Sequence, residues 1–236
     1  MRPFFLLGVW LVGIAALRGE PSRFTSGTTQ TSLLELFTSE GCSSCPPTER
    51  WLATLRDSPV LWRDFVPVAF HVDYWNRLGW PDRFATRKFT RREYDYAAAW
   101  ASGSVYTPCL VRDGVELGDT RTVAPSGRAA GRLTVAYDGT TVHAEFSPAS
   151  PQAGEPFELY AAILGGGIVS RVTAGENSGE ALHHEFIALV LAQAALGHDF
   201  PLAVPKVSGV TRHALAVWVT RRGELAPLQA TGGWLD

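Results

Sequence analysis

The sequence contains little cysteine, and its three Cys residues in 236 are too few to build a fold on disulfides. The fold must therefore rest on a hydrophobic core, for which 46% hydrophobic and 19% charged residues are ordinary. Positive charge is not in excess, because the formal net charge at pH 7 is −2. This balance argues against nucleic acid or an anionic membrane as the main partner. The chain also contains no internal repeat and no low-complexity tract.

The N-terminus carries an apolar run. One Arg precedes the run, which extends from Phe4 to Leu17, and small and polar residues follow it. This pattern is typical of an export signal, and the run is too short for a comfortable membrane span. An uncleaved anchor at residues 1–20 and a buried hydrophobic helix are the alternatives, whereas a lipid anchor would need a Cys after the run. We expect a periplasmic or secreted protein in an oxidising space, with no membrane contact except through such an anchor.

The first half of the chain, up to about residue 125, alternates strand-like and helix-like segments. Short apolar runs at 33–37 and 66–72 predict two strands. Helical spacing predicts helices over Thr48–Arg56 and Thr90–Ala101, and a hairpin turn follows at 112–114. Strand, helix, strand, helix and hairpin is an α/β order, which predicts a sheet covered by helices over residues 30–125.

After residue 125 the pattern becomes β. Alternating apolar and polar residues flank Asp138-Gly139, which is a strong hairpin signal. Segments 156–164 and 213–219 predict two more strands. Segment 182–196 is ambiguous, and we predict a strand that runs on into a helical turn. A smaller β-rich domain is therefore expected over residues 130–236.

Two of the three cysteines form the tetrapeptide Cys42-Ser43-Ser44-Cys45, between the first predicted strand and the first predicted helix. Thiols at this spacing could be a redox couple, half of a metal site, or a staple that closes a turn. The context favours a redox motif, because a thiolate at a helix start is stabilised by unpaired N–H groups and the helix dipole. Pro46 and Pro47 cannot donate hydrogen bonds, so a helix that begins at Pro46 leaves Cys42 outside it. We therefore expect only a modest lowering of the pKa of Cys42.

A second feature favours redox chemistry. Thr107-Pro108 lies after the second predicted helix and directly before the strand that starts at Cys109. An X-Pro bond is only occasionally cis. Redox domains of this class, however, place a cis-proline at this position, opposite the dithiol, where the preceding backbone pairs with the substrate chain. We predict a cis bond here, with Thr107 and Pro108 in substrate binding.

The chain resembles the secreted, uncharacterised bacterial family called domain of unknown function 1223 in four ordered segments: LLELFTSEGCSSCPPTE, AFHVDYWNRLGWPDRFA, SVYTP and GENSGEALHHE. This family belongs to the thioredoxin-like superfamily. The resemblance implies an α/β fold, with a thioredoxin-like domain followed by a smaller β-sandwich-like domain, and it implies no settled substrate.

The resemblance also assigns residues. It places Cys42 and Cys45 on the dithiol, Thr107-Pro108 on the cis-proline loop, and His71, Asp73, Tyr74 and Trp75 on the HVDYW stretch. The sequence departs from the family pattern at Cys109, where a polar residue such as Gln is expected. It departs again after His184, which weakens a role for the fourth segment.

Several polar and aromatic residues are further candidates. His71 and Asp73 alternate along a strand and should face one side at its end, where His71 could act as a proton shuttle or be a satisfied core histidine. Glu35 should face away from the dithiol and be structural. Trp75 and Trp80 should wall the cleft, and Trp75 is expected to bind the substrate together with Thr107 and Pro108. The turn at 175–179 is interpreted as turn chemistry, since Asn and Gly tolerate left-handed backbone.

Three classes of function remain open. In a thiol–disulfide oxidoreductase, Cys42 attacks, a mixed disulfide forms, and Cys45 resolves it. A binding module would keep the Cys42–Cys45 bond as a static staple, and a copper or zinc carrier would use both thiolates and His71. We predict no metal site, because zinc prefers four ligands and no second pair has the spacing, although two thiolates suffice for copper(I). A staple across four residues closes too short a loop to stabilise much, which favours the oxidoreductase.

We expect no cofactor, and as partner a thiol or disulfide client, either a protein or a small thiol. Cys109 is the odd thiol of the chain. It directly follows the proline expected opposite Cys42, but strand alternation should turn its side chain into the core, and free Cys is usually buried. We therefore predict that Cys42 pairs with Cys45 and that Cys109 stays a slowly reacting thiol.

Overall fold

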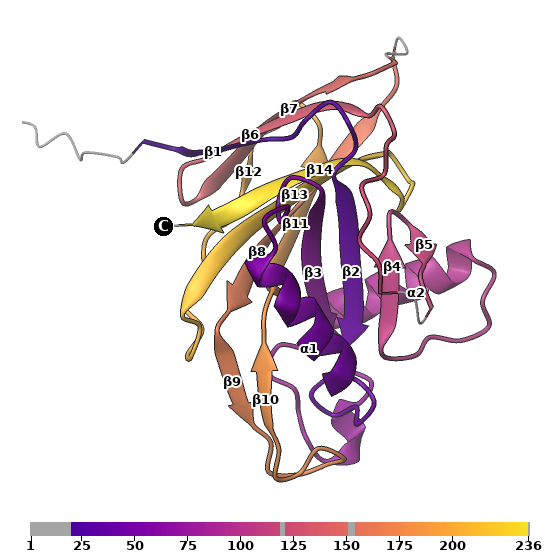
Figure 1. The fold of residues 1–236 in the computed structure, drawn as a ribbon, viewed down its shortest axis with the longest axis vertical. Coiled ribbons are helices and arrows are strands. Elements are labelled where there is room, and N and C mark those ends of the chain that lie inside the picture. Colours follow the sequence, from indigo (N-terminus) through magenta and orange to yellow (C-terminus); the bar gives the residue numbers. More distant parts are fainter. Residues whose placement is uncertain (1–19, 119–120, 151–153, 236) are drawn as a thin grey trace, which may run out of the picture.

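A computed structural model describes residues 20–118, 121–150 and 154–235 (Figure 1). Strand accounts for 43% of the structure and helix for 13%. The predicted α/β class, a thioredoxin-like domain followed by a smaller β-sandwich-like domain, is therefore wrong, and the fold is β-rich. The predicted signal or anchor at 1–20 lies outside the described residues except for Glu20. None of the helices in the described ranges is both long and apolar enough to cross a membrane.

The largest sheet contains eight strands in the order β14-β13-β8-β11-β3-β2-β4-β5. Its strands are β2 (Ser32–Thr38), β3 (Phe65–His71), β4 (Cys109–Arg112), β5 (Val115–Glu116), β8 (Phe157–Gly166), β11 (Ile187–Ala195), β13 (Arg212–Arg221) and β14 (Pro227–Leu235). β2 and β3 are parallel, and β3 also pairs with β11 through Ala69 and Ile187. Strands from both halves of the chain thus share one hydrogen-bonded sheet, so the change of pattern near residue 125 is not a break in the sheet.

Two α-helices lie against β2 from opposite faces: α1 (Pro46–Thr54) and α2 (Arg87–Ala99). Because side chains alternate along a strand, Glu35 contacts α2, whereas Thr38 contacts α1 through Glu49. Proline is tolerated at the start of α1, where its missing N–H would have no intrahelical partner. The Thr86 hydroxyl accepts a hydrogen bond from the N–H of Phe89 and so caps α2. Two short 3-10 helices, Leu55–Asp57 and Asn76–Leu78, complete the helical content of the described residues.

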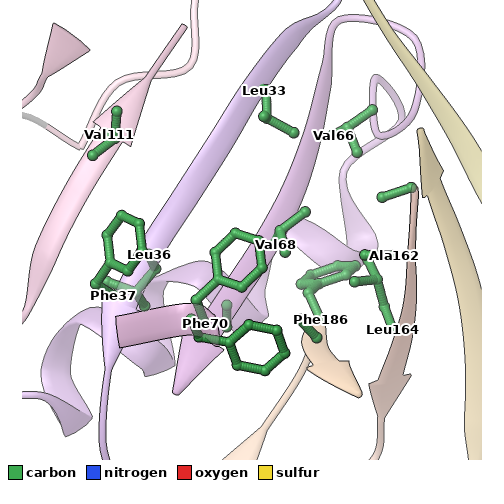
Figure 2. Close-up of a cluster of buried hydrophobic side chains, with 14 of the residues drawn as sticks. Leu33, Leu36, Phe37, Val66, Val68, Phe70, Val111, Ala162, Leu164 and Phe186 are labelled. Carbon is green, nitrogen blue, oxygen red and sulfur yellow. The ribbon is translucent and has the colours of Figure 1, made fainter. Parts of the chain in front are cut away.

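A second sheet of four strands packs against the large one: β1 (Ser22–Thr25), β6 (Gly131–Tyr137), β7 (Thr141–Pro148) and β12 (Phe200–Pro201). Leu159 and Ala161 of β8 belong to the core shared with β6 and β7. Their neighbours Ala162 and Leu164 face the other core, where they lie close to Phe186 (Figure 2). A strand buried on both faces needs a continuous apolar run, which explains the unalternating pattern of this segment.

The predicted hairpin at Asp138-Gly139 is confirmed. The Asp138 carboxylate accepts from the N–H groups of Thr140 and Thr141 at 2.9 and 2.8 Å, and Gly139 has a φ of +91°. The helical turn predicted within 182–196 is wrong. That segment forms most of β10 (Ala181–His184) and all of β11, and the chain bends between these strands at Phe186, which has a φ of 59°. β10 pairs with β9 (Ile168–Arg171) in a separate two-stranded ribbon.

Candidate functional site

A disulfide joins Cys42 and Cys45 in the connection between β2 and α1, as predicted. The two Cα atoms lie 5.5 Å apart, and neither residue is exposed. Cys45 is the N-cap residue of α1, and its carbonyl accepts from the N–H groups of Thr48 and Glu49 at 3.0 and 3.1 Å. The first N–H groups of the helix, those of Thr48 and Glu49, therefore donate to the Cys45 carbonyl and are not directed at the sulfur of Cys42.

The predicted substrate-binding residues lie beside Cys42. The Thr107 carbonyl oxygen is 3.8 Å from the Sγ of Cys42, and the Ser44 hydroxyl is 3.3 Å from the same sulfur. The Trp75 indole donates to the Thr107 hydroxyl at 2.8 Å. The Thr107–Pro108 bond is cis, as the sequence predicted. The structure therefore brings Cys42, Thr107 and Trp75 together.

The loop Gly175–Gly179, between β9 and β10, packs onto the disulfide segment, and we refer to it as the covering loop. The Asn177 side-chain amide donates to the carbonyl oxygens of Glu40 and Cys42 at 2.9 and 3.0 Å. The Glu176 carboxylate accepts from the Ser43 backbone and hydroxyl at 3.1 and 2.7 Å. A pocket of ≈ 390 Å³ opens between this loop and the start of α1, lined by Ser43, Pro46, Glu49, Arg50, Glu176 and Asn177 among others. The sequence showed only turn chemistry here and missed these contacts.

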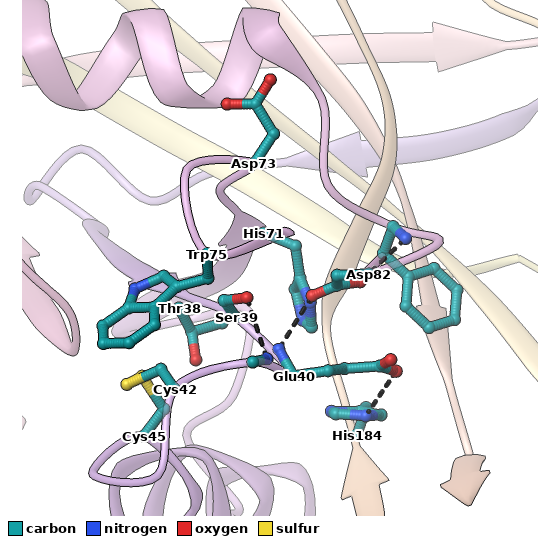
Figure 3. Close-up of polar contacts among 12 residues, drawn as sticks. Thr38, Ser39, Glu40, Cys42, Cys45, His71, Asp73, Trp75, Asp82 and His184 are labelled. Carbon is teal, nitrogen blue, oxygen red and sulfur yellow. Dashed lines mark hydrogen bonds and ion pairs between the residues drawn. A yellow bond between two sulfur atoms is a disulfide. The ribbon is translucent and has the colours of Figure 1, made fainter. Parts of the chain in front are cut away.

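Five buried ionisable residues gather next to the disulfide, and we call them the histidine–carboxylate cluster: Glu40, Glu49, His71, Asp82 and His184. His71 Nδ1 lies 2.6 Å from the Asp82 carboxylate. His184 lies between two other carboxylates. Its Nδ1 is 2.6 Å from Glu49, and its Nε2 is 3.3 Å from Glu40 (Figure 3). The two imidazole rings are 5.3 Å apart between centroids. Three carboxylates therefore face two imidazoles in a water-poor interior.

Charge pairing decides the protonation of this cluster. Burial alone lowers the pKa of His184, but the carboxylates of Glu49 and Glu40 outweigh it and raise the pKa to about 10. Burial likewise opposes a charge on His71, yet Asp82 raises its pKa above the ordinary value. For Glu49 and Asp82, burial opposes ionisation, but the facing imidazoles hold the pKa of each carboxyl below its usual value. The cluster is thus a set of paired charges.

The predicted pair of His71 and Asp73 is not brought together. β3 ends at His71, and Asp73 turns away to accept a hydrogen bond from Thr90 of α2 at 2.7 Å (Figure 3). Strand alternation therefore no longer applies at Asp73. The actual carboxylate partner of His71 is Asp82, which was not predicted from the sequence.

The remaining candidates are placed as follows. Glu35 is buried, pairs with Arg92 at 2.5 Å and accepts from Tyr96, which matches the structural role predicted for it. Trp80 donates from its indole to Glu40 at 2.7 Å. Cys109 is free and buried, as predicted. Four cluster residues were not predicted: Glu40, Glu49, Asp82 and His184. All four lie within the segments that carry the family resemblance, which was the only signal in the sequence that could have found them.

Comparison with known proteins gives a family but no activity. The profile of a family described as "Protein of unknown function (DUF1223)" matches residues 33–220. None of the curated proteins matches the chain. A crystal structure of a protein from Agrobacterium tumefaciens aligns with a TM-score of 0.61 at 23% identity, over 88% of this chain and 94% of that one. A structure described as HBP35 of Porphyromonas gingivalis aligns with a TM-score of 0.58 at 12% identity, over 89% and 77% of the two chains. At these identities the likeness concerns the fold alone.

Proposed function

The chain belongs to the DUF1223 family of proteins of unknown function, and from that premise we propose that it is an exported thiol–disulfide oxidoreductase. Its redox couple is Cys42 and Cys45. The observation that carries the proposal is the Cys42 sulfur beside the Thr107 carbonyl, in a segment held by the Trp75 indole. A disulfide that closes four residues adds little stability, so a purely structural role explains the cysteine pair poorly.

The reaction follows from thiol–disulfide exchange. A client thiolate attacks the sulfur of Cys42, forms a mixed disulfide and releases the Cys45 thiolate, which takes up a proton. A second client thiolate then attacks the client sulfur of the mixed disulfide and releases the Cys42 thiolate. The client gains a disulfide and loses two electrons, and Cys42 and Cys45 gain them. The reverse sequence reduces a client disulfide.

The setting of Cys42 favours a thiolate only weakly. The first helical N–H groups bond to the Cys45 carbonyl, and the nearby interior holds three carboxylates. The polar groups beside the Cys42 sulfur are the Thr107 carbonyl and the Ser44 hydroxyl. We therefore expect a less acidic Cys42 than in a dithiol whose sulfur faces free helix N–H groups.

A second candidate function is a binding module with a static disulfide, and the complete burial of both cysteines favours it. The two candidates differ in the reduction potential of the Cys42–Cys45 pair. A catalytic pair exchanges with a glutathione or dithiothreitol buffer, whereas an inert structural disulfide has a potential below about −300 mV.

The decisive experiment follows thiol count when the protein is mixed with a reduced dithiol peptide and, separately, with an oxidised one. We expect one peptide disulfide to form or break per Cys42–Cys45 pair converted. Cys45→Ser should accumulate a mixed disulfide on Cys42, detectable by peptide mass spectrometry, and Cys42→Ser should not. Absence of exchange with both peptides, together with a potential below the stated limit, would establish the static disulfide instead.

A further inference from the structure

Three polar atoms of the histidine–carboxylate cluster are buried and have no hydrogen-bond partner in the described structure: Glu40 Oε1, His71 Nε2 and His184 Nε2. Two of them, on Glu40 and His184, lie 3.3 Å apart as an ion-pair contact rather than an aligned hydrogen bond. Unsatisfied polar atoms in an interior each cost about 1–3 kcal/mol. Three such atoms in one cluster therefore call for a partner that the protein alone does not supply.

Neighbouring hydrogen bonds hold the side chains that carry these atoms in a fixed orientation. Asp82 accepts from His71 Nδ1, and it is itself held by the N–H groups of Glu40 and Phe84 at 2.8 and 2.9 Å. With Nδ1 donating, a neutral His71 presents the lone pair of Nε2 to the cluster. This carboxylate–histidine arrangement is the usual outer support of a metal-bound imidazole.

Glu49 and Glu40 are oriented in the same way. The Thr38 hydroxyl donates to one oxygen of Glu49 at 2.5 Å, which leaves the other oxygen toward His184. The Trp80 indole donates to one oxygen of Glu40 and leaves the other, Oε1, facing His184. Each carboxylate thus has one oxygen held by a neutral donor and one directed into the cluster.

We propose that Glu49, His71 and His184 bind a divalent transition-metal ion of the zinc type, with Glu40 as a fourth oxygen donor. One ligand atom from each of the first three residues lies within 4.8 Å of the others. Tetrahedral zinc with bonds of about 2.1 Å needs roughly 3.4 Å between ligand atoms, so side-chain shifts of about 1 Å would bring these three atoms to that spacing. Imidazole and carboxylate are suitable donors for such ions.

The charge of the cluster also suits a cation. Glu40, Glu49 and Asp82 face His71 and His184, so the carboxylates outnumber the imidazoles even when both rings carry a proton. The carboxylates that attract a proton to His184 attract a divalent ion more strongly, because the ion carries twice the charge. The ion would tie β10, α1 and β3 together beside the disulfide.

The cluster can be reached from outside. Glu49 lines the ≈ 390 Å³ pocket between α1 and the covering loop. Glu40 lines another pocket, on the side of Trp80 and Arg83. A candidate metal site needs such an entry path as well as its ligands.

The test uses the full chain with Cys109→Ser and the Cys42–Cys45 disulfide intact, so that no thiol can bind metal. After treatment with a chelator, Zn²⁺ is added under calorimetry, and Co²⁺ is added to record the visible spectrum. We expect one equivalent of each ion to bind, with a tetrahedral Co²⁺ spectrum that lacks a thiolate charge-transfer band. His71→Gln, His184→Gln and Glu49→Gln should each weaken Zn²⁺ binding by at least about tenfold.

The matched control is His143→Gln. His143 also faces two carboxylates, Asp199 and Glu145, but on the surface, and its loss should leave the affinity unchanged. If the buried variants fail to fold, hydrogen exchange at the imidazole C2 of the parent, followed by mass spectrometry, replaces them. Zn²⁺ should slow exchange at His71 and His184 only. No stoichiometric binding by the parent, equal binding by the folded variants, or protection of other histidines would overturn the proposal.

Discussion

Asn177 donates its side-chain amide to the carbonyl oxygen of Cys42 at 3.0 Å, although 135 residues separate the two in the chain. The same amide donates to the carbonyl of Glu40 at 2.9 Å, so one side chain holds the covering loop to the disulfide segment. Asn177 is buried, and both acceptors are backbone groups that cannot turn away. This contact makes the second half of the chain part of the candidate active site. If the chain exchanges disulfides as proposed, we expect the covering loop to move when a client reaches Cys42.

Asn177→Ala should therefore make the disulfide easier to reach. The change removes two buried hydrogen bonds. It leaves the Glu40 carbonyl without this donor, at a cost of about 1–3 kcal/mol to the closed loop, whereas the Cys42 carbonyl keeps the N–H of Cys45. We expect reduction of the Cys42–Cys45 disulfide by dithiothreitol to become several-fold faster, measured by alkylation and mass spectrometry. Ser178→Ala is the control, because Ser178 is exposed and its hydrogen bond to Gly175 is through the backbone. Equal rates for Asn177→Ala and the parent would show that the loop does not limit access.

Cys109 should react slowly in the native protein. Burial and the carboxylate of Glu93 raise the pKa of this thiol from 9.0 to about 12. At pH 8 the thiolate fraction is then about three orders of magnitude below that of an ordinary thiol. We expect iodoacetamide to label Cys109 slowly in native protein and fast after denaturation, and Cys109→Ser to leave disulfide exchange nearly unchanged. Peptide mapping that found Cys109 bonded to Cys42 or Cys45 would make it a third redox participant.

The sequence predicted local elements better than their assembly. The strands at 33–37 and 66–72, both helices, the hairpin at Asp138-Gly139 and the cis bond at Pro108 depend on short-range patterns, and the structure contains all of them. The α/β class was wrong because sheet continuity depends on distant pairing. The contact of Ala69 with Ile187, which joins β3 to β11, has no signature in either segment.

In the candidate site too, residues marked by a local pattern were predicted, and contacts between distant residues were not. Cys42, Cys45 and Thr107 were found because spacing and context identify them locally. The pairing of His71 with Asp73 was expected from strand alternation, but the strand ends at His71 and the partner is Asp82. His184 comes to Glu49 only through the fold, since 135 residues separate them. A contact between a histidine and a carboxylate that lie far apart in the chain cannot be predicted from residue spacing.

Glu93 should make the protein less stable as pH rises. Burial raises the pKa of its carboxyl from the ordinary 4.5 to about 7, so the folded protein holds a proton there that the unfolded chain has lost. Between these two values the free energy of unfolding should therefore fall with increasing pH. Glu93→Gln should make this slope smaller, while the raised pKa of His184 keeps part of it above pH 6.5. The variant should stabilise the protein by about 1–3 kcal/mol at pH 8, measured by urea unfolding at pH 4.5 and 8. Glu180→Gln, at an exposed position, should keep the slope, and an unchanged slope in Glu93→Gln would contradict the assignment.

Two neighbouring arginines of α2 offer a test of the interior on that side of the sheet. Arg92 is buried and pairs with Glu35 at 2.5 Å, and its guanidinium lies 5.3 Å from the ring centroids of Tyr160 and Trp218. Arg91 is exposed and pairs with Asp95 one turn along. Arg92→Met should cost about 3–5 kcal/mol of unfolding free energy, because it leaves the Glu35 charge buried without its partner.

Arg91→Met removes the same charge and adds the same side chain, yet an exposed pair one turn apart is worth about 0.3–0.5 kcal/mol. Comparing the unfolding free energies of the two variants in urea at pH 7 therefore separates the effect of burial from the effect of losing a positive charge. Arg92→Met with Glu35→Leu should recover most of the lost stability, since no unpaired charge then remains in the core. If Arg92→Met proved no more costly than Arg91→Met, Glu35 would have to find water or another partner, and the closed packing of α2 on β2 would be wrong.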